Sequence, residues 1–156
     1  MLRISKLADY GTVIMVHLAN CAPQLCNARD IAHHTHLSVP TVSKLLKRLT
    51  TSGLLVSVRG VAGGYRLQRP AAKISVAEIL CALDDQRGLI ECSLQPNACS
   101  LQNFCHVQGN WRLISQAIDS ALASVSLEML AKPVLKSRDI ERIKQLASSG
   151  VNGSEQ

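Results

Sequence analysis

The 156-residue sequence predicts a mainly α-helical protein with a small β-hairpin wing, arranged as a winged helix-turn-helix followed by a long dimerisation helix. Three patterns lead to this prediction. A short helical segment and a longer one are separated by a tight turn. A glycine-rich hairpin pattern follows the longer segment directly. A long apolar helical segment then comes after a loop that holds three of the six cysteines.

The first helix is predicted over about residues 6–20, because apolar residues recur there at helical spacing. These residues are Leu7, Tyr10, Val13, Ile14 and Leu18. Asp9 lies about 200° round the helix from Leu7, so its side chain is expected to point away from the apolar stripe. The run Cys21-Ala22-Pro23 ends this helix.

A short second helix is predicted over 28–35, with Asn27 as its N-cap. Its inward-facing residues are Ala28, Ile31 and Ala32. The tight turn His36-Leu37-Ser38 follows, and Ser38 caps a third helix whose first turn tolerates Pro40. Gly53 ends the third helix. This order of elements is the outline of a helix-turn-helix.

The third helix has two distinct faces. Its apolar residues are Val42, Leu45, Leu46 and Leu49. Its polar and basic residues lie largely off that face and are Thr41, Ser43, Lys44, Lys47 and Arg48. A recognition helix needs this division, because one side packs while the other offers donors and cations to the major groove. An ordinary surface helix would look the same, so the next segment has to decide.

That segment reads as a wing. Residues 54–58 are strand-like, residues 59–64 are rich in glycine, and residues 65–67 form a returning strand. Glycines such as Gly63 allow the backbone to approach a phosphate closely, and Arg59 can insert into a narrow minor groove. A nucleotide-binding phosphate loop is the competing interpretation. The segment lacks the Lys-Ser/Thr pair that follows the glycines in such a loop, and no helix is predicted directly after them.

The distribution of charge supports a polyanionic partner for the first half only. Residues 1–70 contain nine Lys/Arg and two Asp/Glu, whereas residues 71–156 contain eight and nine. A solvated basic surface is the plain alternative. In a DNA complex, we expect phosphate contacts from Lys47, Arg48 and Arg66 and base contacts from Thr41, Ser43 and Lys44. Arg59 is expected to contact the groove beside the wing. Ser38 and Gly63 are the remaining predicted DNA-binding residues.

The second half begins with a capping box, Ser75-Val76-Ala77-Glu78, which opens a helix to about Asp84. In it, Ile79, Leu80 and Leu83 are expected in the core, and Cys81 is expected to be a small buried hydrophobe. A helix over roughly 109–125 is apolar on more than one face, which predicts a homodimer interface. Ser126 caps a short turn to Leu130. The tail allows a weak helix around 140–146 and is expected to be disordered from Ser148.

These elements suggest three parts. Residues 1–70 form the DNA-binding domain, and residues 71–131 hold the capping helix, the cysteine loop (residues 92–106) and the dimerisation helix. Residues 132–156 form a polar, partly disordered tail. No apolar run approaches the roughly 20 residues that a membrane-spanning helix needs, and the N-terminus lacks a signal-peptide pattern, so a cytoplasmic protein is expected.

Three cysteines of the loop, Cys92, Cys99 and Cys105, are candidate metal ligands, because cytosolic thiols stay reduced. Thiolates suit iron–sulfur clusters and zinc. Structural zinc usually takes Cys pairs two to four residues apart, whereas the intervening stretches here are six and five residues. From the residues alone, a cluster, zinc and plain thiols all remain open. Cys21 and Cys26 are interpreted as incidental, and His33, His34 and His36 as a solvated face or phosphate contacts.

The combination of motifs resembles a known family. The motifs are Ile4-Ser5-Lys6, the wing from Val58 to Tyr65, the three loop cysteines, and Trp111 six residues after the last of them. Over about residues 1–130 they resemble the Rrf-two family of bacterial transcription regulators, which includes IscR and NsrR, and within it the branch that regulates the SUF iron–sulfur assembly operon. The resemblance implies a winged-helix homodimer that binds a pseudo-palindromic DNA operator.

The resemblance also implies an iron–sulfur cluster (2Fe-2S or 4Fe-4S) on Cys92, Cys99 and Cys105. Two features depart from the family pattern: the first cysteine gap is one residue longer, and Gln108 stands where IscR has histidine. Asp9 matches an aspartate that NsrR offers from the partner subunit. The fourth ligand is therefore Asp9 of the partner subunit, His106, or an exchangeable small ligand.

Two other functions compete with this interpretation. One is a cluster-free winged-helix repressor that senses thiol oxidation or zinc. The other is an iron–sulfur electron-transfer protein, which leaves the wing and the basic half unexplained. An enzyme is not expected, because no catalytic constellation or nucleotide fingerprint stands out in the sequence.

Overall fold

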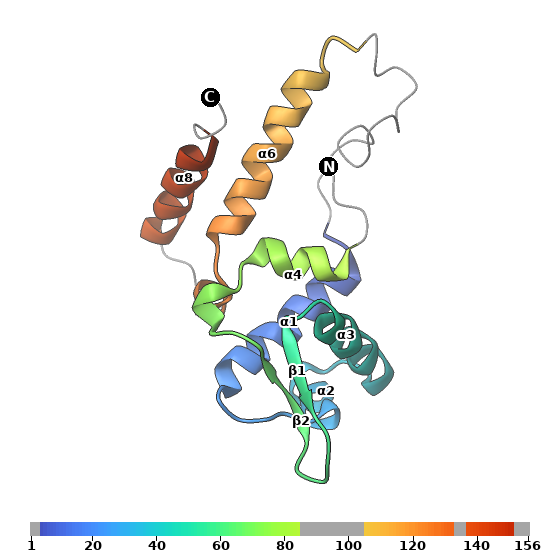
Figure 1. Ribbon diagram of the computed structural model, residues 1–156. Helices are drawn as coiled ribbons and strands as arrows, with labels where there is room; N and C mark the ends of the chain where they lie inside the picture. Colours follow the sequence, from blue (N-terminus) through green and yellow to red (C-terminus); the bar gives the residue numbers. More distant parts are fainter. Residues whose placement is uncertain (1–3, 85–104, 133–136, 152–156) are drawn as a thin grey trace.

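The structure, a computed structural model, describes residues 4–84, 105–132 and 137–151 (Figure 1). Its elements in the winged-helix body are α1 (Lys6–Cys21), α2 (Ala28–Thr35), α3 (Val39–Thr51), β1 (Leu55–Val58) and β2 (Gly64–Leu67). They are followed by η1 (Ala71–Lys73), α4 (Val76–Leu83), α6 (Gln108–Ser124), α7 (Leu127–Leu130) and α8 (Ser137–Val151). The predicted mainly α-helical fold with a β-hairpin wing is confirmed.

The helix starts follow from capping side chains. Asn27, Ser38, Ser75 and Ser126 each accept a hydrogen bond from a backbone N–H three residues further on. In the capping box before α4, the amide of Glu78 donates to Ser75 Oγ over 3.2 Å. The amide of Ser75 donates to Glu78 Oε2 over 2.8 Å. Both orphan donors at this helix start are thus satisfied, as the sequence pattern predicts.

The core of the body lies between α1, α2 and α3. The apolar face predicted for α3 is fully buried at Val42, Leu45, Leu46 and Leu49, and burying each of these side chains contributes about 1.5–3 kcal/mol. The stripe predicted for α1 needs one correction. Val13 is 42% exposed, and Met15 is fully buried instead, because the helices pack on the face that also carries Ile14 and Leu18.

The wing is an antiparallel pair in which Leu55 lies opposite Leu67 and Val58 lies opposite Gly64. Leu55 and Leu67 are buried, so the base of the hairpin is packed into the core. At its tip, the amide of Gly63 donates to the carbonyl of Gly60 over 3.0 Å. A Cβ at Gly63 would overlap the carbonyl oxygen of Val58, so this turn requires glycine.

Helix α4 packs against α1 at a point of very close approach. A Cβ added to Gly11 would overlap Leu83 Cδ1, and Leu83 is only 2% exposed. Ile79 and Leu83 are buried as predicted, whereas Leu80 is half-buried. The prediction that Cys81 is buried is wrong: its side chain is exposed. The reason is helical geometry, since Cys81 lies two residues, or about 200°, from the buried Ile79.

Helix α6 extends away from the winged-helix body, with α8 alongside it (Figure 1). No residue of α6 is buried, and Trp111, Leu113 and Ile114 remain exposed. Helix α7 anchors the base of α6, because Leu127 is fully buried and its amide donates to the carbonyl of Ile74 over 2.7 Å. An apolar helix with this little cover from its own chain is what the predicted dimer interface requires.

The predicted weak helix in the tail exists as α8. It continues to Val151, so the expectation of disorder from Ser148 is wrong for residues 148–151, and the remaining tail residues lie outside the described chain. Among the described residues, no helix is long and apolar enough to cross a membrane.

Candidate DNA-binding face and cysteine sites

The solvent-facing side of α3 carries the residues predicted to contact DNA. Ser43, Lys44 and Lys47 are exposed, and Thr41 and Arg48 are half-buried. The hydroxyl oxygens of Ser38 and Thr41 lie 2.7 Å apart and hydrogen-bond to each other. This hydrogen bond stabilises the first turn of α3. The Thr41 hydroxyl therefore already has a hydrogen-bond partner in the absence of DNA.

The wing presents its predicted cations to solvent. Arg59 follows β1 directly and Arg66 lies on the outer face of β2, and both side chains are exposed. The fold itself explains Gly63, because its position against Val58 leaves no room for a side chain. A phosphate contact is therefore not needed to account for glycine at that position.

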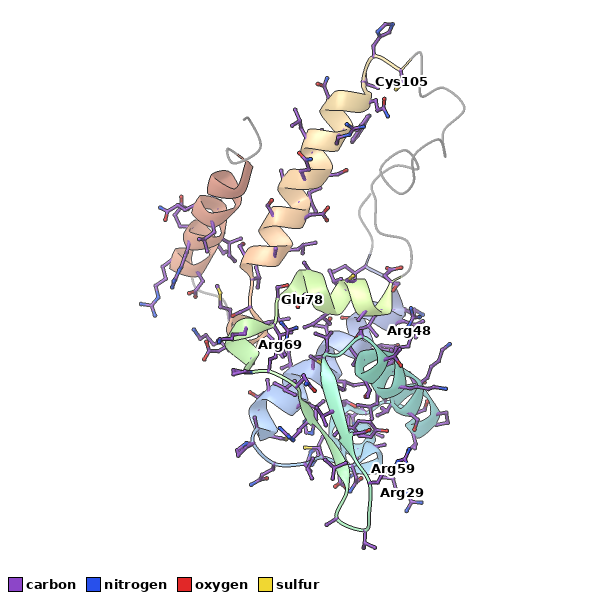
Figure 2. All side chains as sticks on the ribbon, viewed as in Figure 1. Arg29, Arg48, Arg59, Arg69, Glu78 and Cys105 are labelled. Carbon is purple, nitrogen blue, oxygen red and sulfur yellow. The ribbon has the colours of Figure 1, made fainter. Side chains whose placement is uncertain are left out.

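The sequence analysis left Arg29 out of the predicted DNA contacts, and it counted the charge of Arg69 in the basic half. Arg29, in the first turn of α2, is exposed, and Figure 2 places it with Arg59 toward the wing end of the molecule. Only the folded arrangement brings α2 and the wing to the same end. Arg69 was counted with the basic half, but its guanidinium lies 2.7 Å from the Glu78 carboxylate. Another of its nitrogens donates to the carbonyl of Lys73 over 3.2 Å.

The Arg69–Glu78 pair has an electrostatic consequence. The backbone N–H of Ser75, and next the Arg69 guanidinium, hold the pKa of the Glu78 carboxyl below its ordinary value. Glu78 is therefore ionised wherever the protein is folded near neutral pH, and the charge of Arg69 is compensated within its own chain. Arg69 is consequently a poor candidate for a phosphate contact.

The structure describes only some of the predicted metal ligands. Cys92 and Cys99 lie outside the described residues. Cys105 is half-buried, His106 is exposed, and Figure 2 shows Cys105 at the end of α6 that is remote from the winged-helix body. Asp9 is exposed in the first turn of α1, which confirms that it faces away from the core.

A second group of side chains could hold a metal ion, although the sequence analysis interpreted Cys21 and Cys26 as incidental and did not consider His17. His17, Cys21 and Cys26 have donor atoms within 4.8 Å of one another. Burial, with a hydrogen bond to Cys21, raises the pKa of the Cys26 thiol to about 11. Burial, and next the neighbouring His34, lowers the pKa of His17. The spacing was a signal that the sequence analysis did not use, because four residues separate Cys21 from Cys26 and His17 lies one helical turn before Cys21.

The fold and the basic face can now be compared with known proteins. Residues 4–133 match the Rrf2 (Rrf-two) family, described as iron-dependent transcriptional regulators. The chain belongs to this family. The identification of the family from its motifs is therefore confirmed.

Individual relatives agree with this assignment. The HTH-type transcriptional regulator IscR of Xenorhabdus nematophila is 38% identical over 103 residues, which cover 66% of this chain and 62% of that relative. The chain thus matches less than two thirds of the relative's length. Among solved structures, CymR of B. subtilis, described as the global cysteine regulator, has a TM-score of 0.67 and 29% identity, with 84% of this chain and 97% of CymR covered. IscR of T. potens has a TM-score of 0.64 and 29% identity, with 83% and 85% covered.

Proposed function

We propose that an iron–sulfur cluster controls how tightly this regulator binds its operator, and that the regulated genes serve iron–sulfur cluster assembly, as in the SUF system. The position of Cys105 carries the proposal. Its thiol lies at the outer end of α6, on the segment that joins α4 to α6, and away from the face that meets DNA (Figure 2). A ligand bound there can change without competing with DNA for the same surface.

The donor set suits this cofactor. Cys92, Cys99 and Cys105 offer three thiolates on one segment, and thiolates hold iron–sulfur clusters. When bound, the cluster supplies a change in charge and ligation that follows iron and sulfide supply or oxidation. The fourth donor is Asp9 of the partner subunit, His106 or a small ligand. Similarity to regulators named IscR supports the cluster and its target genes.

Helix α4 is the part of the chain that would transmit such a change. It leads into the cysteine loop and packs against both α1 and α3. At its C-terminal end, Leu83 lies in the close approach to Gly11. A displacement of the loop would therefore move the winged-helix body that carries the recognition helix. If the bodies of the two subunits took two discrete relative positions, the dimer would have two operator affinities.

The DNA complex would follow from two copies joined through the exposed apolar residues of α6. Each copy would place α3 in a major groove, so the operator would be pseudo-palindromic, with half-sites about one helical turn apart. Lys47, Arg48 and Arg66 would contact phosphates, and Ser43 and Lys44 would reach base edges, with Thr41 beside them. Arg59 would enter the groove on the wing side, with Arg29 next to it.

The deciding experiment compares the cluster-loaded and cluster-free protein, prepared without oxygen. We expect visible absorption bands with matched iron and acid-labile sulfide in the parent protein and their loss in Cys92→Ala. We also expect an operator affinity that differs between the two states by about 10-fold or more, in the range of ordinary allosteric coupling. Colourless, iron-free protein, or equal affinity of both states, would refute the proposal.

Mixed dimers identify the fourth ligand. A dimer of one Asp9→Ala chain and one Cys105→Ala chain retains one complete site if Asp9 acts across the interface, because each lesion then falls in the same site. The same mixed dimer has two damaged sites if the ligands come from one chain. Half of the parent's iron content therefore indicates Asp9 of the partner subunit. Unchanged iron in Asp9→Ala homodimers indicates His106 or a small ligand.

A thiol-sensing regulator is the second candidate function. The likeness to CymR, the global cysteine regulator of B. subtilis, and the adjacent thiols of Cys21 and Cys26 favour it. This function predicts that DNA affinity responds to oxidants in a variant whose loop cysteines Cys92, Cys99 and Cys105 are all serine. The cluster-controlled function predicts no such response.

A further inference from the structure

Helix α1 ends in a group of side chains that the cysteine loop does not explain. His17 and Cys21 stand one helical turn apart on α1, so both point to the same side of the helix. The His17 Nε2 and Cys21 Sγ atoms are 3.5 Å apart. Cys26 follows in the loop before α2, and its side chain is buried. The sulfur of Cys26 completes a triangle whose edges are all within 4.8 Å.

The dimensions of this triangle suit a small tetrahedral metal site. With zinc–sulfur bonds of about 2.3 Å and zinc–nitrogen bonds of about 2.1 Å, tetrahedral geometry places nitrogen and sulfur about 3.6 Å apart and two sulfurs about 3.8 Å apart. The measured 3.5 Å between His17 and Cys21 already matches the first value. Closing the remaining edges from at most 4.8 Å needs about 1 Å of movement. Side-chain rotation alone can provide that movement.

Backbone contacts fix the third ligand in place. The amide of Cys26 donates to the carbonyl of Tyr65 over 3.1 Å, and the amide of Tyr65 donates back to Cys26 over 2.9 Å. Cys26 is thereby attached to strand β2 at Tyr65, one residue after the start of that strand. The group thus joins three parts of the DNA-binding body: the end of α1, the loop that leads into α2, and the wing.

The surroundings also suit a cation. The ring of His34 is stacked on that of His17, with centroids 5.2 Å apart and planes 25° from parallel. The negative charge of the nearby Asp30 carboxylate is one of the smaller causes that raise the pKa of the Cys26 thiol, after burial and the neighbouring Cys21. Two thiols, an imidazole and a nearby carboxylate give a site that favours thiophilic or borderline divalent ions over Mg²⁺ or Ca²⁺, which take oxygen ligands.

We propose that His17, Cys21 and Cys26 form a second metal site, separate from the cysteine loop, that binds one divalent cation of the zinc class. The three side chains supply three of four tetrahedral positions, and water or another small ligand supplies the fourth. Binding fixes strand β2 of the wing to the end of α1. It therefore stabilises the DNA-binding body and holds the wing at one angle to the recognition helix.

The test uses full-length protein in which Cys92, Cys99 and Cys105 are serine, so the loop takes up neither cluster nor metal. Cobalt(II) is the probe, because tetrahedral thiolate ligation gives it characteristic visible and charge-transfer bands. Reduced protein is titrated with cobalt and then with zinc. Two ligand variants, His17→Gln and Cys21→Ser, are compared with Cys81→Ser, which removes an exposed thiol elsewhere. Both ligand positions are half-buried, and circular dichroism verifies that each variant is folded.

We expect one cobalt per chain, displacement by zinc, and a higher melting temperature with zinc bound. Cys81→Ser should retain cobalt affinity. His17→Gln and Cys21→Ser should each lose at least about 100-fold, because removing merely an outer partner of a ligand already costs 10–100-fold. Absence of tetrahedral cobalt in folded, reduced protein would overturn the proposal, as would equal losses in Cys21→Ser and Cys81→Ser. A Cys21–Cys26 disulfide formed in air, without cobalt uptake by the reduced protein, would identify a thiol pair and also overturn it.

Discussion

The salt dependence of DNA binding tests which cations face the phosphates, and Lys47 and Arg69 make a matched pair. Both are basic residues of the first 70 and contribute equally to the net charge of that half. The fold separates them: Lys47 is exposed on α3, whereas Arg69 lies 2.7 Å from the Glu78 carboxylate. We therefore expect Lys47→Gln to change the electrostatic part of binding and Arg69→Gln to leave it unchanged.

The size of the effect follows from counterion release. Lys47, Arg48 and Arg66 in both subunits of the proposed dimer give six phosphate contacts, so log K should fall against log salt with a slope of about −5.4. Lys47→Gln removes two of these contacts, which reduces the slope to about −3.6. Between 50 and 200 mM salt, the parent should then lose about 1,800-fold in affinity and the variant only about 150-fold.

Fluorescence anisotropy with a labelled DNA duplex, titrated at four or five salt concentrations, measures these slopes directly. A random-sequence duplex serves as well as an operator, because the electrostatic contribution does not depend on sequence. Equal slopes in the parent and Lys47→Gln would refute the assignment of α3 as the phosphate-contacting helix. A reduced slope in Arg69→Gln would show that the ion pair with Glu78 opens when DNA binds.

Three further predictions concern stability and reactivity. The folded protein lowers the pKa of Glu78, so the stability that the ionised Glu78 carboxylate contributes is complete above its ordinary pKa of 4.5. This stability is lost as pH falls through the lowered pKa of the folded state. Glu78→Gln should therefore cost about 0.5 kcal/mol at pH 7, and urea denaturation should show this difference shrinking on acidification. Gly63→Ala should lower the free energy of unfolding by about 1 kcal/mol or more and weaken DNA binding, whereas Ala62→Gly at the same tip should not. Iodoacetamide should modify exposed Cys81 at least about 10-fold faster than Cys26 at pH 8, since burial raises the pKa of Cys26 to about 11. Peptide mass spectrometry that found Cys26 modified first would contradict its burial.

Local patterns predict most of this fold, because its helices begin at side-chain caps and bury regular apolar faces. The capping box at Ser75 and the buried leucines of α3 are examples, since both depend on residues within one turn of each other. The wing is equally local, as its two strands are joined by a short glycine turn. The errors at Val13 and Cys81 arise where a helix has apolar residues on two sides, and packing against the rest of the chain determines which side is buried.

The candidate sites depend more on long-range contacts. Residues of α3 could be assigned to the DNA face in advance, because an amphipathic helix defines its own outer side. The pairing of Arg69 with Glu78, nine residues apart, needs the turn through η1, which no periodicity reveals. The meeting of His17, Cys21 and Cys26 likewise depends on how the loop after α1 returns to β2.

The contact between Gly11 and Leu83 has a consequence for the operator itself. No side chain fits between the two helices at Gly11, and α1 packs on α4, so we expect the two helices to move together. A signal that arrives through α4 would then turn each DNA-binding body as a rigid unit. The base preference within a half-site would stay constant, and the preferred number of base pairs between half-sites would change. Selection from a pool of operators with randomised spacer lengths would reveal the state of the regulator as a shift in spacing.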